Sequence, residues 1–283
     1  MKWYVNLLVS IIAFFIGVGI AYLTGSYIVL NAVLLAFLIQ WVAFIPAYTF
    51  QTEKFYDLTG TLSYLTVVWF TYILSNVSSE TNIGNLLLAL LISMWAVRLG
   101  SFLFLRIHKA GEDKRFRKIK PSPSQFFMTW TLQGLWVSLC SMCALTAISS
   151  EVGVVTGMIF YIGVILFLIG FFIEVIADNQ KSKFRSLEEN KDSFITTGLW
   201  ARSRHPNYFG EIMLWTSVAI IALPSLSGMQ YLTLISPIFT YVLLVHISGV
   251  RMLEDMGTKK WGHIEEYKDY KFKTPRIFPK FLK

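Results

Sequence analysis

The strongest constraint on the fold of this chain is a series of long apolar segments that recurs from one end of the sequence to the other. A helix needs about 20 apolar residues to cross the roughly 30 Å of hydrocarbon in a bilayer, and its backbone amides must bond within the helix there. Runs of suitable length lie near 5–24, 27–48, 61–76, 84–105, 126–149, 153–177, 208–224 and 229–250. The sequence therefore predicts an all-α integral membrane protein, a multi-pass helical bundle of about eight spans within a range of seven to ten.

The scarcity of charge supports this class. Only 15% of the 283 residues are charged, whereas a soluble domain has about 25%. Met1 and Lys2 stand before the first run as in a signal peptide, but no small-residue cleavage site precedes the second run. We therefore expect the first run to be a retained helix.

Lysine and arginine, apart from Arg98, are confined to alternate connecting segments. They occur at Lys2, at Lys54, in 106–120, in 181–204 and from Arg251 onward, and the intervening segments contain none. Positively charged loops stay in the cytoplasm, so both termini are expected there, in a bacterial inner membrane or, in a eukaryote, the endoplasmic reticulum. The net charge of +8 then reflects topology and attraction to anionic membrane lipids. No basic segment has the context of a nucleic-acid module, so we expect no nucleic-acid partner.

The chain shows no internal repeat and no low-complexity linker, which predicts a single membrane domain over 1–283. Cys140 and Cys143 lie inside a span without a neighbouring histidine or charge, and this favours packing over a redox or metal role. We expect no metal site. Gly153 and Gly157, four residues apart at the start of the sixth run, predict a close contact between helices.

The first polar connection, residues 50–60, carries candidate catalytic side chains. Glu53, Tyr56, Asp57 and Gly60 are spaced at three or four residues, so one helical face would present an acid, a phenol and a second acid. A short interfacial helix with its tyrosine in the aromatic belt fits the same residues. Both interpretations stay open at this point.

Arg98 lies inside the fourth run, where a guanidinium costs at least ~2.5 kcal/mol, so it must face the bundle interior with a partner or snorkel to the membrane edge. A structural ion pair and an anion-binding role are both open. The following segment, 106–120, is expected to be a solvated topology anchor, with Asp113 and Arg115 the first positions to test.

The sixth run ends in carboxylates and cations that share one helical face. Glu174 and Asp178 are four residues apart, and Lys181 and Arg185 continue the same face. Carboxylates accept hydrogen bonds from hydroxyl and amide groups, while lysine and arginine hold phosphate oxygens. A nucleotide site and a simple paired helix end both fit, and we favour the nucleotide.

A dense polar string, Ser203 to Glu211, opens directly into the seventh run. Pro206 suits the first turn of a helix because its missing N–H is not needed there. A helix N-terminus preceded by arginines and a histidine favours anions. A capped anchor helix does not explain why Asn207 and Glu211 continue into the membrane. A second polar set, Arg251 to Asp255, is expected to fold back over the same region.

These motifs resemble those of the membrane-embedded steroid 5-alpha-reductase and sterol reductase superfamily, most closely a bacterial branch of unknown function. The shared pattern runs from Glu174 and Asp178 through Gly198-Leu-Trp to Ser-Arg204-His-Pro-Asn-Tyr-Phe-Gly-Glu211. The resemblance implies a cytosol-facing cavity that holds NADPH, in a core of about 126–283. The cofactor-binding residues that it and the spacing indicate are Glu174, Asp178, Asn179, Lys181, Arg185, Arg204, His205, Asn207, Tyr208, Gly210, Glu211 and Arg251.

The chain differs from that superfamily at the two positions that contact the substrate. The steroid reductases place a substrate-binding glutamate where this chain has Trp41, after Gln40, and an assisting tyrosine near Trp95. Trp95 and Arg98 are therefore candidate substrate contacts, and Glu53 or Tyr56 is the candidate catalytic group that polarises a conjugated carbonyl.

The expected function is reduction of an activated C=C bond by NADPH in a lipophilic, steroid- or isoprenoid-like substrate drawn from the bilayer, with no obligate protein partner. An alternative is a membrane methyltransferase using S-adenosylmethionine, because Arg-His-Pro-x-Tyr-x-Gly and the Arg251–Asp255 set are similar to those of isoprenylcysteine carboxyl methyltransferases. Asn207 and Glu211 favour the reductase. A transporter or lipid-binding scaffold is the third class, disfavoured because the polar groups cluster at one side.

Overall fold

The computed structural model describes residues 2–76 and 82–280, and within these ranges every regular element is a helix. Eight helical segments are long and apolar enough to cross a membrane. They are α1 (Trp3–Leu23), α2 (Tyr27–Thr49), α3 (Tyr56–Ser75), α4 (Ile83–Ala110), α5 (Pro123–Ile148), α6 (Met158–Ser186), α7 with a terminal 3-10 turn (Pro206–Ser225), and Gly228–Trp261. This confirms the predicted all-α multi-pass membrane protein.

One difference from the predicted spans is at α6, which begins at Met158 and not near 153. Gly153 lies in the preceding turn with a φ of 62°, in the left-handed region that favours glycine. A Cβ added to Gly157 would meet nothing within 4 Å. A Cβ on Gly153 would lie 2.5 Å from Asn82 Nδ2 at the start of α4, so this glycine allows a close approach of the turn to a helix. The predicted contact between two helices through both glycines is wrong, because neither lies in a helix.

The chain divides into two compact units, Met1–Ile159 with Ala219–Ser236 (unit 1) and Phe160–Val218 with Pro237–Lys283 (unit 2). The predicted cofactor core of about 126–283 includes α5, which belongs to unit 1, whereas unit 2 begins within α6 at Phe160. Where a cofactor core begins stays a prediction. All twelve predicted cofactor-binding residues lie in unit 2, whereas Glu53, Tyr56, Trp95 and Arg98 lie in unit 1.

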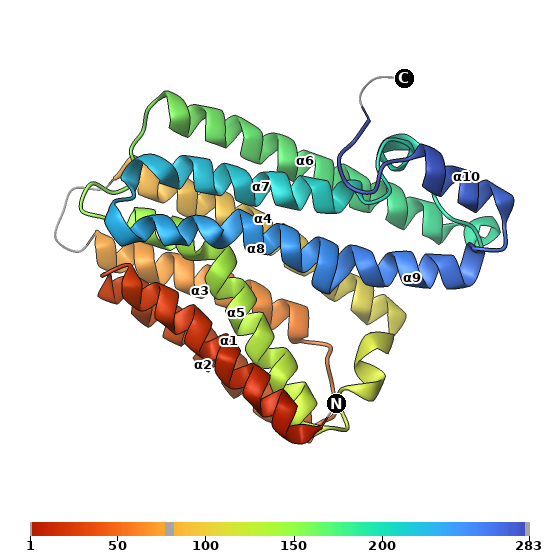
Figure 1. The fold of residues 1–283 in the computed structure, drawn as a ribbon, viewed down its shortest axis with the longest axis horizontal. Coiled ribbons are helices and arrows are strands. Elements are labelled where there is room, and N and C mark those ends of the chain that lie inside the picture. Colours follow the sequence, from red (N-terminus) through yellow and green to blue (C-terminus); the bar gives the residue numbers. More distant parts are fainter. Residues whose placement is uncertain (1, 77–81, 281–283) are drawn as a thin grey trace. The chain divides into compact units, whose positions relative to one another are not determined.

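Unit 1 is built around α5, which packs against α1, α2 and α3 (Figure 1). Its buried hydroxyls bond to carbonyls of the preceding turn: Ser138 Oγ donates to Gly134 O at 2.7 Å and Ser141 Oγ to Val137 O at 2.6 Å. Such bonds satisfy polar groups inside the helix, so they do not need water. Cys140 and Cys143 are buried thiols on the same helix, and they form no disulfide within the described residues.

Unit 2 is organised by a close approach of α6 and α7. A Cβ on Gly210 would lie 2.6 Å from Gly170 O and 2.7 Å from Glu174 N, and a Cβ on Gly170 would lie 2.7 Å from Gly210 O. Only glycine at both positions lets the two backbones meet so closely. This contact fixes which turns of α6 and α7 face each other.

The last span continues into unit 2 as α8 (Ile235–Val242), a π-helical turn (Leu243–Ile247) and α9 (Gly249–Trp261), followed by α10 (Glu265–Lys273). A π turn inserts one residue and interrupts the ordinary helical ladder. Gly249 follows the turn, and a Cβ there would lie 2.9 Å from the Tyr208 ring. The turn and the glycine together seat α9 against the start of α7.

Candidate functional site

The predicted carboxylates come together on the facing turns of α6 and α7. Glu174, Asp178 and Glu211 are only 2%, 6% and 5% exposed. Asn207 Nδ2 donates to Asp178 Oδ1 at 3.2 Å, which joins the two motifs that the sequence placed 29 residues apart. Asn207 Oδ1 is buried and accepts no hydrogen bond in the part of the chain that the structure describes. An acceptor thus remains available beside a carboxylate.

Gly210 also belongs to this region, where it lies against α6. Its Cα faces the backbone of α6 at Gly170 and Glu174, so a helix occupies the space that a cofactor would need there. The structure gives Gly210 a helix-packing role, and a cofactor contact there stays a prediction. The residue shapes the site by bringing Glu174 toward α7.

A second cluster forms around Glu254 of α9. Its carboxylate accepts from Arg204 Nη1 at 2.5 Å and lies 2.9 Å from His205 Nε2 and 3.3 Å from Lys271 Nζ. Sequence reasoning did not select Glu254 as a site residue. The available signal was its position three residues after Arg251, on the same face of a helix, but nothing local shows that its partners lie 50 residues earlier.

His205 is held in one orientation by this carboxylate and by Tyr208. Its ring is 5% exposed and stacks on Tyr208 with centroids 5.9 Å apart. Burial lowers the pKa of His205 below its usual 6.5, and the hydrogen bond to Glu254 opposes that shift. We infer a neutral ring that donates from Nε2, since the partner is a carboxylate. Nδ1, which has no partner among the described residues, is then an acceptor.

Four other predicted cofactor residues lie near the surface of unit 2. The Lys181 ammonium sits 4.3 Å from the centroid of the Trp200 ring, a cation–π contact. Asn179, Arg185 and Arg251 have exposed side chains. The structure therefore separates the predicted set into a buried group, which includes Asp178, and a group of exposed side chains.

The C-terminal segment lies against the start of this site, as expected for a segment that folds back. Ser203 Oγ donates to Ile277 O at 2.7 Å, and the Arg204 amide donates to Pro275 O at 2.9 Å. Tyr270 Oη donates to Trp200 O at 2.7 Å. These bonds hold the backbone around Arg204 and His205 against the C-terminal segment, which follows α9 in the sequence.

Glu53 and Tyr56, the predicted catalytic pair, have structural partners in unit 1. Glu53 is 4% exposed, accepts from the Asp113 amide at 2.8 Å and pairs with Lys120 Nζ at 2.5 Å. Tyr56 Oη donates to Thr129 O at 3.1 Å. Their catalytic role stays a prediction, and these contacts support a role in holding the connections of unit 1 together.

The predicted substrate contacts occupy different environments on α4. Trp95 is 2% exposed and meets the Tyr64 ring edge to face at 5.1 Å. The Arg98 guanidinium is half-buried and stacks 5.3 Å from the Phe102 ring centroid on its own helix. Two glutamines that the sequence did not single out have unused hydrogen-bond acceptors. Gln40 and Gln133 each bury an amide oxygen that has no partner among the described residues.

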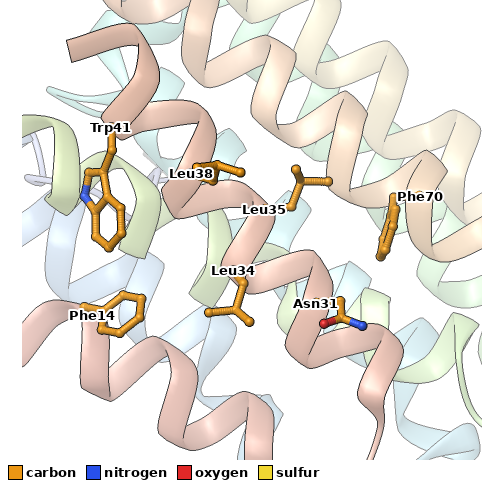
Figure 2. Close-up of a pocket in the computed structure, with 7 residues that line it drawn as sticks. All are labelled: Phe14, Asn31, Leu34, Leu35, Leu38, Trp41 and Phe70. Atoms are coloured by element: carbon orange, nitrogen blue, oxygen red, sulfur yellow. The ribbon is translucent and has the colours of Figure 1, made fainter. Parts of the chain in front are cut away.

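An apolar groove of about 420 Å³ opens on α1, α2 and α3 of unit 1 (Figure 2). Trp41 lines one end, and its indole Nε1 donates to Thr131 Oγ1 at 3.0 Å, which leaves the ring as an apolar wall. Figure 2 shows Leu34 and Leu38 along the middle and the Asn31 amide at the other end. The groove suits a hydrocarbon chain.

The unit 2 site combines unused hydrogen-bond acceptors with a buried donor. It offers acceptors at Asp178, Asn207 Oδ1 and His205 Nδ1, together with buried donor capacity at Arg204 Nε. Among the described residues, no group of three or more histidine, cysteine, aspartate or glutamate side chains is placed to hold a metal ion. The site is therefore suited to a polar organic molecule with several hydroxyl, amide or amine groups.

A comparison with protein families matches residues 43–274 to the family described as a protein of unknown function, DUF1295, and the chain belongs to that family. Comparisons with curated proteins and with solved structures find no match. The match spans both the α3–α5 region of unit 1 and nearly all of unit 2.

Proposed function

We propose that this DUF1295 protein is a membrane oxidoreductase that uses NADPH to reduce an activated C=C bond in a lipophilic substrate. The observation that carries the proposal is a group of buried polar atoms in unit 2 with unused hydrogen-bonding capacity, which includes His205 Nδ1, Asn207 Oδ1 and Arg204 Nε. Buried polar atoms of native proteins are nearly always paired, so such a set marks a place for a ligand.

The residue types fit the parts of a dinucleotide. Acceptors at Asp178, Asn207 and His205 suit ribose hydroxyls and a carboxamide NH₂. The exposed cations Arg185 and Arg251 and the nearby Lys181 suit phosphate oxygens. Bound NADPH would supply a hydride to the β-carbon and leave as NADP⁺, and a proton from solvent would complete the reduction at the α-carbon. These side chains would orient the cofactor, and the surrounding helices would limit the access of bulk water.

The resemblance of the Glu174–Glu211 motifs to steroid 5-alpha-reductases supports the same cofactor. In those enzymes an acid holds the substrate ketone, and Trp41 replaces it here. Trp41 lines the apolar groove, and its N–H is already bonded to Thr131. It therefore cannot polarise a ketone as the acid does in those enzymes. We propose that the substrate is an extended apolar molecule.

The second candidate is an S-adenosylmethionine-dependent methyltransferase. The observation that favours it is the contact of Glu254 with both Arg204 and His205, because the Arg-His-Pro and Arg-x-x-Glu motifs that meet there are the ones shared with isoprenylcysteine carboxyl methyltransferases. The Asp178–Asn207 bond joins a variable position of that shared motif to a carboxylate outside it, and it favours the reductase.

Replacement of Asn207 by alanine tests the site. We expect Asn207→Ala to weaken NADPH binding about tenfold, since one hydrogen bond to a ligand is lost and Asp178 loses its donor. Binding is measured by isothermal titration of the detergent-purified chain. Thr216→Ala, which removes an exposed hydroxyl from the same helix, is the matched control. Equal affinities for both variants would contradict a cofactor contact at Asn207.

A further inference from the structure

The connection between α4 and α5 is a folded cationic turn and not a loose tether. Residues Lys114–Lys118 form a 3-10 helix, which has three residues per turn. Phe116 is buried, and Ile119, three residues on, packs against the same apolar cluster. The remaining positions of the turn, Lys114, Arg115, Arg117 and Lys118, are all basic and exposed. We call these four side chains and their turn the η1 surface.

The η1 surface is anchored to the rest of unit 1 at three points. The Phe116 ring meets Tyr56 at 5.0 Å and Phe126 at 6.1 Å between centroids. Glu53 binds the backbone amide of Asp113 before the turn and the Lys120 ammonium after it. The cations are therefore presented on a fixed support, which reduces the entropy lost when they bind a ligand.

The acids within this connection are already used. Glu112 pairs with Arg117, and Asp113 pairs with Arg115. The hydrogen bond from Arg117 lowers the pKa of Glu112, so this acid stays ionised with its own partner. Lys114 and Lys118 make no ion pair or side-chain hydrogen bond within residues 2–76 and 82–280. Two exposed positive charges thus remain on a rigid turn.

The neighbourhood of the turn is that of a membrane edge. The helix that leads to it, α4, has 28 residues and is about 42 Å long, longer than the roughly 30 Å of hydrocarbon, so it ends outside the hydrocarbon. Phe55 and Leu105, each 55% exposed, lie at this end of unit 1, and Phe55 stacks on Phe104 at 6.3 Å. Apolar side chains and unpaired cations occur together there.

We propose that Lys114 and Lys118 of the η1 surface bind the phosphate headgroup of an anionic phospholipid, with its acyl chains beside Phe55 and Leu105. Each basic side chain at the membrane surface strengthens the binding of an anionic lipid about fivefold. The proposal is independent of the proposed reductase activity, because it concerns unit 1 and needs no cofactor.

The test measures lipid binding to the full chain in a neutral detergent by native mass spectrometry. The protein is titrated with phosphatidylglycerol and, separately, with phosphatidylcholine. We expect a preference for phosphatidylglycerol in the unmodified chain. The double variant Lys114→Gln, Lys118→Gln should lower affinity for phosphatidylglycerol about thirtyfold and leave phosphatidylcholine binding unchanged.

The matched control is Lys183→Gln, Lys259→Gln, which removes two exposed lysines of unit 2 and the same net charge. Unchanged phosphatidylglycerol binding in this control supports a local site, whereas an equal loss in both double variants would mean a general charge effect and overturn the proposal. Displacement of the lipid by millimolar inorganic phosphate would also overturn it, since the turn would then be a free-anion site. Phe116→Ala keeps every cation and should still weaken binding, because the support of the turn is lost.

Discussion

Three basic side chains converge on one carboxylate, that of Glu254, although they come from widely separated parts of the sequence. Arg204 and His205 precede α7, and Lys271 belongs to α10. The carboxylate is therefore the point at which the polar string, the last span and the C-terminal segment are tied together within unit 2. Its loss should affect several elements at once.

We expect Glu254→Gln to lower the free energy of unfolding of the detergent-purified protein by about 1–3 kcal/mol, because Arg204 would be left partly buried without an opposite charge. The readout is the midpoint of thermal unfolding. Glu265→Gln, which removes an exposed acid paired with Lys268, is the control and should change the midpoint little. If both variants unfold alike, Glu254 does not organise the site.

His205 makes the stability of unit 2 depend on pH. Its pKa is lowered on folding, chiefly by burial, with Lys181 of α6 and Arg204 acting in the same direction and Glu254 opposing them. The unfolded chain therefore binds this proton more readily than the folded one, so stability is full above about pH 6.5 and falls as the pH drops below that value.

Thermal unfolding midpoints measured from pH 7.5 to 5.0 should decline, and His205→Gln should flatten that decline. The comparison is made within each variant, so that a constant loss of stability from the substitution does not matter. A decline of the same slope in both proteins would show that other groups cause it.

At the scale of elements, the approach of α6 to α7 sets the spacing of Glu174, Asp178 and Asn207. Gly170 and Gly210 allow that approach because each lies against the backbone of the other helix. A methyl group at either position would push the helices apart and alter the Asn207–Asp178 hydrogen bond.

We expect Gly210→Ala to destabilise the protein by about 1–3 kcal/mol through overpacking. Gly19→Ala is the control, since a Cβ at Gly19 of α1 meets nothing within 4 Å and alanine is the better helix former. The two unfolding midpoints are compared directly. If Gly210→Ala left the unfolding midpoint unchanged, α6 and α7 would not be held as closely as the structure describes.

The spans were predictable because hydrophobic length alone decides which segments cross a membrane. The carboxylate face of α6 was predictable as well, from the spacing of Glu174, Asp178 and Lys181. The role of Gly210 was not, since a glycine beside polar residues serves a ligand or a helix equally well until its neighbour is known. Glu254 was missed because its meaning lies in partners that only the tertiary fold brings near.

At the scale of the whole molecule, the two units differ in the kind of chemistry that they offer. Unit 1 carries an apolar groove and the η1 surface, both suited to lipid. Unit 2 carries buried acceptors and cations, suited to a polar organic molecule. Family membership covers parts of both units, as expected if the proposed activity needs a lipophilic substrate and a water-soluble cofactor.

The central claim is that unit 2 binds NADPH, and thermal unfolding of the unmodified chain with added ligand tests it most directly. A ligand at 100 times its Kd stabilises the folded state by about 2.7 kcal/mol. We therefore expect NADPH to raise the unfolding midpoint in a concentration-dependent way and S-adenosylmethionine to leave it unchanged. A rise with S-adenosylmethionine and none with NADPH would contradict the account and favour the methyltransferase.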